Sequence, residues 1–230
     1  MGDRIEFQSN QTTVSGYLAV PAGGSTDTPG VLVLQEWWGV IDQITRTCDR
    51  LAEAGFTALA PDLYQGKEVP LTEPDEAAKE MMALEMGRAA DDLSGAVDEL
   101  LRRTGRGSIG ALGFCMGGGL ALVLACQRPD AVAVVVPAYG VIPWPDARPD
   151  YPAMTAAVLG HVAELDGAFT PESASALEAE LIALGRDVTF YVYPGVDHAF
   201  FNEDRPDVYD AAAAELLWGR TVAFLHAQLD

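Results

Sequence analysis

The segment Gly113-Phe114-Cys115-Met116-Gly117 constrains the fold of this chain more than any other part of the sequence. The apolar residues 108–112 before it predict a short buried strand, and residues 118–125 after it predict the start of a helix. Glycines on both sides of a cysteine permit a sharp turn here, because side chains at those positions would clash with neighbouring backbone. The turn would hold the Cys115 thiol beside the partly positive N-terminus of the helix, which favours a thiolate. The alternative is a tight turn around a buried, inert cysteine.

Strands and helices are predicted to alternate along the chain. This alternation indicates a mostly parallel sheet covered by helices on both faces, with ligands bound beyond the carboxyl ends of the strands. One long helix is expected at 75–103, and a break in it would fall near Gly87. The other expected strands lie at 13–20, 31–34, 56–60, 132–136, 154–159 and 188–193, and the other helices at 41–54, 171–184 and 206–228.

The composition limits the class of protein and its partners. A chain of 230 residues, 49% of them hydrophobic, is long enough for one α/β domain over residues 1–230. Its net charge of −20 at pH 7 disfavours binding to nucleic acid and to anionic membranes. No signal-peptide core or membrane-spanning run is visible, so we expect a cytoplasmic protein. Cys48, Cys115 and Cys126 are an odd number without metal-like spacing, which argues against a disulfide framework.

A cysteine nucleophile needs a base that takes its proton. His198 follows the last expected strand in a loop, from which its ring can reach over the edge of the sheet. His161 ends a strand and can simply be packed, and His226 lies late in the terminal helix. His198 is therefore the preferred base.

The base in turn needs an acid that fixes its tautomer and stabilises the imidazolium. Glu164 and Asp166 both follow the last expected strand but one, and Asp197 is a third candidate. Asp197 is disfavoured because adjacent side chains rarely point at each other in the required way. Asp166 is preferred, with Glu164 as its closest rival. The order Cys115, Asp166, His198 is the nucleophile, acid, base order of α/β hydrolases, and it predicts that fold.

A charged and aromatic segment closes the strand expected at 31–34. Glu36 would lie beside the catalytic edge of the sheet, where its carboxylate would contact the thiol. The backbone N–H groups of Trp37 and Met116 would form an oxyanion hole. Trp37 and Trp38 suit an apolar or aromatic substrate wall. The alternative is a surface or helix-capping glutamate beside two core tryptophans.

Five segments carry a recognisable pattern, in order over nearly the whole chain: residues 35–40, 61–64, 113–118, 161–166 and 193–200. Together they resemble the dienelactone hydrolase family of α/β hydrolases. The resemblance implies that Cys115 is the nucleophile and that Asp166 and His198 are its partners. It also implies that Glu36 engages the resting thiol and helps to deprotonate it when substrate arrives. No metal or organic cofactor is implied.

The sequence departs from this family where substrate is bound. Members that hydrolyse dienelactone hold the substrate carboxylate with one arginine before the elbow and one shortly after the histidine. Residues 72–78 contain no arginine, and Arg205 comes later after His198 than expected. An uncharged small-molecule ester or lactone therefore fits better than dienelactone, with Trp38, Phe200 and Arg205 as expected substrate contacts.

The sequence thus predicts a hydrolase of carboxylic esters or lactones that acts through a Cys-His-Asp triad and an acyl-enzyme. The alternative is a small-molecule-binding protein with a vestigial triad. A third hypothesis, a redox-sensing thiol at Cys115, would favour a nearby resolving cysteine, whereas Cys126 is expected to face the core. The oligomeric state stays open.

Overall fold

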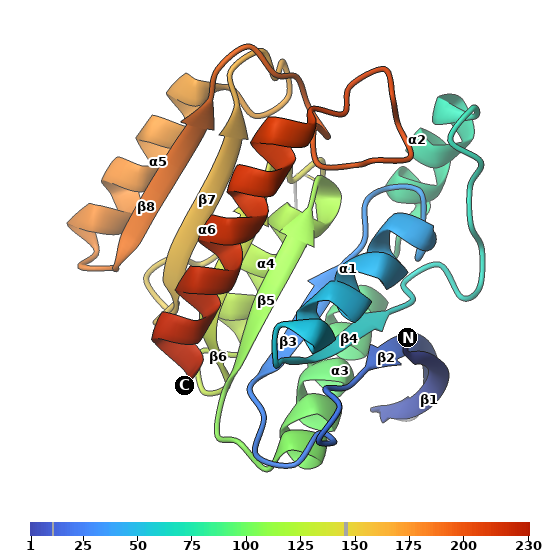
Figure 1. Cartoon of the computed structure of the whole chain (residues 1–230). Helices are drawn as coiled ribbons and strands as arrows, with labels where there is room; N and C mark the ends of the chain where they lie inside the picture. Colours follow the sequence, from blue (N-terminus) through green and yellow to red (C-terminus); the bar gives the residue numbers. More distant parts are fainter. Residues whose placement is uncertain (11, 145–146) are drawn as a thin grey trace.

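A computed structural model describes residues 1–10, 12–144 and 147–230 of the chain (Figure 1). In these residues the strands form one eight-stranded sheet in the order β1-β2-β4-β3-β5-β6-β7-β8. The strands are β1 (Asp3–Ser9), β2 (Thr12–Ala19), β3 (Gly30–Leu34), β4 (Thr57–Pro61), β5 (Ile109–Phe114), β6 (Val132–Ala138), β7 (Ala157–Ala163) and β8 (Val188–Tyr193).

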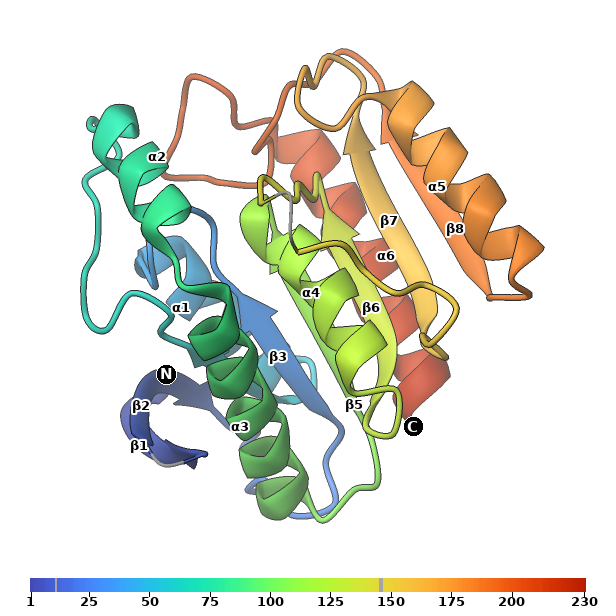
Figure 2. The same cartoon turned by 180° about the vertical axis from the view of Figure 1, so that it is seen from behind.

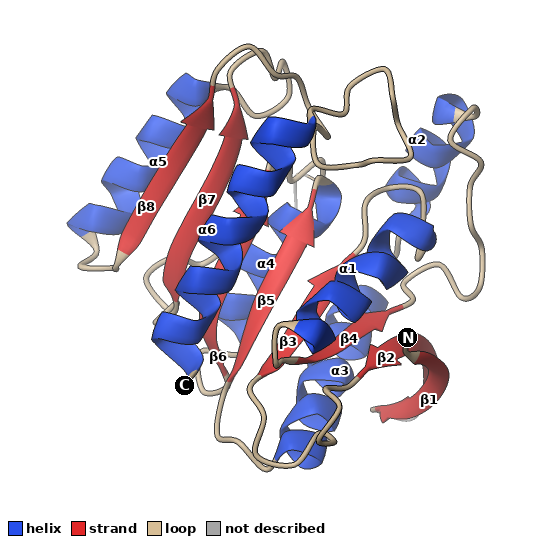
Figure 3. Ribbon diagram, viewed as in Figure 1, coloured by secondary structure: helices blue, strands red, loops and turns tan. Residues whose placement is uncertain are grey.

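The direction of strand pairing changes once along the sheet (Figure 3). β1 and β4 each pair antiparallel with β2, whereas the pairs from β4 through β3, β5, β6 and β7 to β8 are parallel. Every residue of β3, β4 and β5 is buried, as expected for parallel strands that are covered on both faces. The parallel strands therefore present their carboxyl ends at one edge of the sheet.

Helices cover both faces of the sheet (Figure 2). α1 and α6 lie on one face, and α3, α4 and α5 lie on the other. Each face has its own apolar cluster, with Ile44 and Leu217 in the first and Leu100 and Leu120 in the second. The predicted layered α/β arrangement is therefore confirmed. The helices are α1 (Asp42–Glu53), α2 (Pro74–Ala83), α3 (Met86–Thr104), α4 (Met116–Gln127), α5 (Pro171–Ala183) and α6 (Ala211–Leu229).

The long helix expected at 75–103 is divided into α2 and α3. Glu85 causes the division, because its carboxylate accepts hydrogen bonds from the amides of Gly87 (3.1 Å) and Arg88 (2.8 Å) and so caps α3. The break thus falls just before Gly87.

Other boundaries also differ from the predicted ones. β7 begins at Ala157 rather than at 154. α6 begins at Ala211 rather than at 206, because Asp210 caps it by accepting a hydrogen bond from the Ala213 amide (2.8 Å). β1 is an additional edge strand, and its mostly exposed residues offer no apolar run that predicts it.

None of the helices in the described residues is long and apolar enough to cross a membrane.

Candidate active site

Cys115 lies at the turn between β5 and α4, with backbone angles φ 53° and ψ −121°. A positive φ is strained for a residue other than glycine, and such strain is common at functional sites. The flanking glycines permit the turn. A Cβ atom on Gly113 would lie 2.0 Å from the Gly117 carbonyl oxygen, and one on Gly117 would lie 2.4 Å from that of Leu34. The predicted need for both glycines is therefore confirmed.

The backbone of Cys115 is held by the end of β6 and the loop after it. Its amide donates to the Ala138 carbonyl (3.1 Å), and its carbonyl accepts from the amides of Val141 and Gly118 (both 3.0 Å). The side chain is nearly buried, yet it lines the main cavity. The thiol is thus presented from a rigid turn.

His198 and Asp166 meet beside this turn. Nδ1 of His198 lies 2.7 Å from Oδ2 of Asp166, whose side chain is fully buried. Oδ1 of Asp166 accepts hydrogen bonds from the amides of Ala168 (2.7 Å) and Phe169 (3.1 Å). Burial opposes ionisation of Asp166, but these hydrogen bonds and the charge of His198 hold the pKa of its carboxyl below the usual value.

The two rival carboxylates have other partners. Glu164 accepts a hydrogen bond from the Gly195 amide (2.7 Å), and Asp197 accepts one from the backbone amide of His198 (2.7 Å). Asp166 is therefore the carboxylate that the structure brings to the imidazole ring.

The environment of His198 favours its protonated form. Burial opposes the imidazolium, but Asp166 and Cys115 favour it through hydrogen bonding and charge, and together they raise the pKa of His198 to about 10. His198 and Cys115 line the same cavity. The imidazolium that forms when His198 accepts a proton from the thiol would therefore be stabilised.

Glu36 is buried to 1% exposure and bound by two neutral donors. Its carboxylate accepts hydrogen bonds from the Tyr139 hydroxyl (3.2 Å) and from Nδ2 of Asn202 (2.8 Å). Burial raises the pKa of the Glu36 carboxyl, and the Asn202 contact, the charge of His198 and the Tyr139 contact offset only part of this. The expected contact with the thiol is not among the hydrogen bonds of the described residues, where the two carboxylate oxygens accept from Tyr139 and Asn202.

Tyr139 and Asn202 are site residues that the sequence analysis missed. Tyr139 directly follows β6 at φ 39°, and its ring packs edge-on against His198 with centroids 5.1 Å apart. Burial, followed by the charges of Glu36 and Cys115, raises the pKa of the Tyr139 hydroxyl. The sequence could have indicated Tyr139 as a site residue because it follows the carboxyl end of a strand. It could have indicated Asn202 because that residue is close to His198 in the sequence.

The two amides expected to form an oxyanion hole are free in the described residues. Neither the Trp37 amide nor the Met116 amide donates a hydrogen bond to an acceptor in that part of the chain. Met116 is the first residue of α4, where backbone N–H groups have no partner within the helix.

The cavity at this site has a volume of about 570 Å³. Trp37 and Arg205 line it, and Nη2 of Arg205 lies 2.8 Å from Oδ2 of Asp207. Trp38 and Phe200 are corrections to the expected substrate contacts. Both are buried in the core, at 2% and 0% exposure, and neither lines the cavity.

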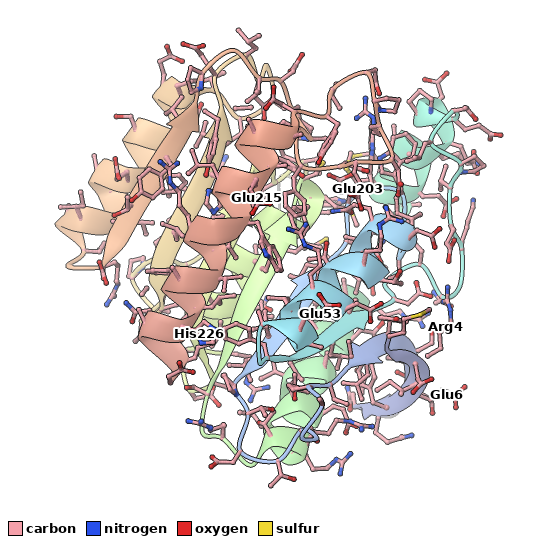
Figure 4. The ribbon with its side chains drawn as sticks, in the orientation of Figure 1. Arg4, Glu6, Glu53, Glu203, Glu215 and His226 are labelled. Carbon is pink, nitrogen blue, oxygen red and sulfur yellow. The ribbon has the colours of Figure 1, made fainter. Side chains whose placement is uncertain are left out.

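The loop from β8 to α6 carries His198, Asn202 and Arg205, and α1 holds it in place. Arg46 of α1 pairs with Glu203 (2.5 Å) and Asp204 (2.6 Å). Glu203 is labelled in Figure 4. The site histidine therefore belongs to a loop that is tied to the neighbouring helix.

The other two histidines lie apart from this cavity. His161 is buried between the hydroxyls of Tyr193 (2.8 Å) and Thr221 (3.0 Å), and burial lowers its pKa to about 3. His226 lies on α6 and is bonded to the Ala54 carbonyl (Figure 4). The described residues contain no group of three or more metal-ligating side chains that could hold a metal ion.

The sheet topology and the strained turn between β5 and α4 define an α/β hydrolase. Residues 14–229 match the model of the dienelactone hydrolase family, and the chain belongs to this family. The resemblance inferred from the sequence is therefore confirmed, and the chain is a hydrolase of the dienelactone hydrolase type.

Relatives match over the full length. The chain is 37% identical to protein usf of Aquifex pyrophilus and 33% identical to a putative carboxymethylenebutenolidase of Aquifex aeolicus, with 100% of both chains covered in each case. The structure of a putative dienelactone hydrolase from Klebsiella pneumoniae has a TM-score of 0.87 at 24% identity and covers 98% of both chains. That structural likeness confirms the α/β-hydrolase fold.

Proposed function

We propose that this protein hydrolyses uncharged carboxylic esters or lactones through a Cys115–His198–Asp166 triad. The observation that carries the proposal is the 2.7 Å contact between His198 and Asp166, with the imidazole and the Cys115 thiol facing one cavity. A nucleophile, a base and an acid that orients the base form the working set for acyl transfer.

The first half of the reaction forms an acyl-enzyme. Sγ of Cys115 attacks the carbonyl carbon while the ring of His198 takes the thiol proton. The negative charge then develops on the carbonyl oxygen, which the Trp37 and Met116 amides stabilise. The tetrahedral intermediate collapses, His198 donates its proton to the leaving alkoxide, and a thioester to Cys115 remains.

The second half releases the acid. A water molecule attacks the thioester carbonyl while His198 accepts one of its protons. The C–S bond breaks, the proton returns to the thiolate, and the carboxylic acid leaves. Asp166 stabilises the imidazolium in both halves.

Glu36 has a further part in this proposal, at the same cavity as the thiol. Its hydrogen bonds to Tyr139 and Asn202 hold it in the resting state. Its role in deprotonation would require the carboxylate to turn towards the thiol when substrate enters the cavity.

Location and partners belong to the proposal as well. All three cysteines carry free thiols, which suits a reducing compartment such as the cytoplasm. We take a small molecule as the partner and residues 1–230 as one functional unit, with no metal or cofactor involved.

The decisive experiment compares wild type, Cys115→Ala and Cys126→Ala with p-nitrophenyl acetate and a neutral lactone. Loss of the nucleophile should lower kcat by several orders of magnitude, and mass spectrometry of quenched wild type should detect an acetyl group on Cys115. Cys126 is a buried thiol that does not line the cavity, so its substitution is the control. Near-normal turnover by Cys115→Ala would overturn the mechanism, and binding without turnover by wild type would favour a ligand-binding protein.

A further inference from the structure

The cavity beside Cys115 is larger and more apolar than acyl transfer to water requires. Its volume of about 570 Å³ lies within the range that accommodates organic ligands of substantial size. Six of the residues that line it, here called the apolar wall, carry large apolar or aromatic side chains and come from four segments of the chain. The apolar wall consists of Leu122, Ile142, Pro143, Tyr151, Phe169 and Leu177.

The charged residues that line the same cavity already have partners. Glu36 is bound by Tyr139 and Asn202, and Arg205 is paired with Asp207. His198 is bound to Asp166. A substrate carboxylate in this cavity would have to compete with Asp207 for Arg205 and with Asp166 for His198. A buried carboxylate that stays unpaired costs several kcal/mol.

The apolar wall is held in a fixed relation to the triad. Oδ1 of Asp166 accepts hydrogen bonds from the Ala168 and Phe169 amides, while Oδ2 binds His198. The helix that carries Leu177 is also bound to the sheet, because Glu178 of α5 accepts a hydrogen bond from the amide of Phe190 in β8 (2.9 Å). This hydrogen bond therefore holds the backbone of α5, on which Leu177 lies, against β8.

We propose that the substrate carries an uncharged apolar group of about six to ten carbon atoms, on the acyl or the alcohol side, that binds against the apolar wall. Leu177 and Phe169 then determine specificity. This inference rests on the proposed hydrolysis at Cys115, and it goes further by naming the substrate class.

Two ester series measure the preference. The first contains p-nitrophenyl esters with acyl chains from acetate to decanoate, and the second contains acetates of straight-chain alcohols from ethanol to decanol. Burial of each methylene contributes about fourfold to kcat/KM (~0.8 kcal/mol). Complete burial of four added methylenes would therefore raise kcat/KM by about 250-fold, and because burial can be partial we expect a gain of at least about tenfold in one series. A steady decline with chain length in both series would overturn the inference.

A substitution that fills part of the cavity tests whether the preference for long esters arises at the apolar wall. The measured quantity is kcat/KM for the preferred long ester divided by kcat/KM for the two-carbon ester. Leu177→Trp should lower this ratio by about tenfold, because the indole occupies space that the carbon chain of the long ester needs. Ile182→Trp is the control, since Ile182 lies on the same helix and its side chain is 60% exposed. An equal ratio in wild type and Leu177→Trp, with both folded by thermal unfolding, would also overturn the inference.

Cys115→Ala separates this inference from the proposed function. Suppose that this variant loses all hydrolysis and that wild type prefers two-carbon esters. That result would support the proposed hydrolysis at Cys115 and contradict the inference that the substrate carries a long apolar group. Should wild type hydrolyse none of the esters, protection of Cys115 from iodoacetamide decides the matter. Protection by 1-octanol but not by ethanol supports the apolar wall as a binding surface, and equal alkylation rates with both alcohols contradict it.

Discussion

Asn202 donates a 2.8 Å hydrogen bond to the carboxylate of Glu36, and both side chains are almost fully buried. The pair joins the loop after β8 to the segment after β3. A neutral amide offsets only part of the cost of burying a carboxylate, so the pKa of Glu36 stays raised. This pair therefore connects the stability of the protein to pH.

Glu36→Gln should stabilise the protein progressively as pH rises. A carboxyl whose pKa is raised on folding favours the folded state below its unfolded pKa, and this contribution is lost as pH rises through the folded pKa. Glutamine has no such loss. The difference in unfolding free energy between variant and wild type should grow from near pH 4 upward, by about 1.4 kcal/mol for each unit of raised pKa.

Urea unfolding at a series of pH values measures this difference. Glu53, an exposed residue of α1 (Figure 4), provides the control Glu53→Gln. A difference for Glu36→Gln that does not change with pH would contradict the prediction.

Asp166→Asn should lower kcat by roughly 10²–10⁴-fold with little change in fold, because the amide favours the wrong tautomer of His198. The pKa of His198, raised to about 10 in the wild type, should also fall, since the neighbouring carboxylate is lost. Steady-state kinetics and NMR titration of the imidazole report the two effects. Glu164→Gln is the matched control, and loss of activity in that variant instead would reassign the acid.

Gly117→Ala should destabilise the protein by about 1–3 kcal/mol or more. The new Cβ would lie 2.4 Å from the Leu34 carbonyl oxygen and 2.6 Å from that of Gln35, so β3 or α4 must shift. In Gly219→Ala, within α6, the Cβ would meet no atom within 4 Å. Because alanine is the better helix former, that variant should gain about 0.5–1 kcal/mol. Thermal unfolding of both tests the argument, and equal effects would refute it.

A neutral lactone or short ester should be a better substrate than an acidic analogue of the same size. Arg205 lines the cavity, but its guanidinium is paired with Asp207, and the chain carries a net charge of −20. Values of kcat/KM at fixed salt measure the preference in wild type and Arg205→Ala. A wild-type preference for the acid that disappears in Arg205→Ala would show that Arg205 anchors a substrate carboxylate.

The turn at Cys115 and the Asp166–His198 contact could be predicted because both depend on backbone signals and chain order. Glycines at 113 and 117 are required by close backbone approach, and the carboxyl ends of parallel strands bring distant loops to one edge. Both features depend on the course of the backbone, which the positions of glycines and the order of strands in the sequence predict directly.

Side-chain direction in loops could not be predicted in the same way. Trp37 lines the cavity whereas Trp38 is in the core, and nothing in two adjacent tryptophans indicates which is which. Tyr139 reaches Glu36 from a backbone with φ 39°, a conformation that tyrosine rarely adopts. The partners of Glu36 therefore emerge only when three loops are folded together.

The two oxygens of Asp166 restrict how this protein can change its substrate range over evolutionary time. A backbone rearrangement near Phe169 would disturb the carboxylate that also binds His198. Leu122 lies on α4, Leu177 on α5 and Ile142 in the loop after β6, and none of the three is hydrogen-bonded to Asp166. Adaptive mutations that alter selectivity without loss of turnover should accumulate at those three positions, and libraries for directed evolution are best concentrated there.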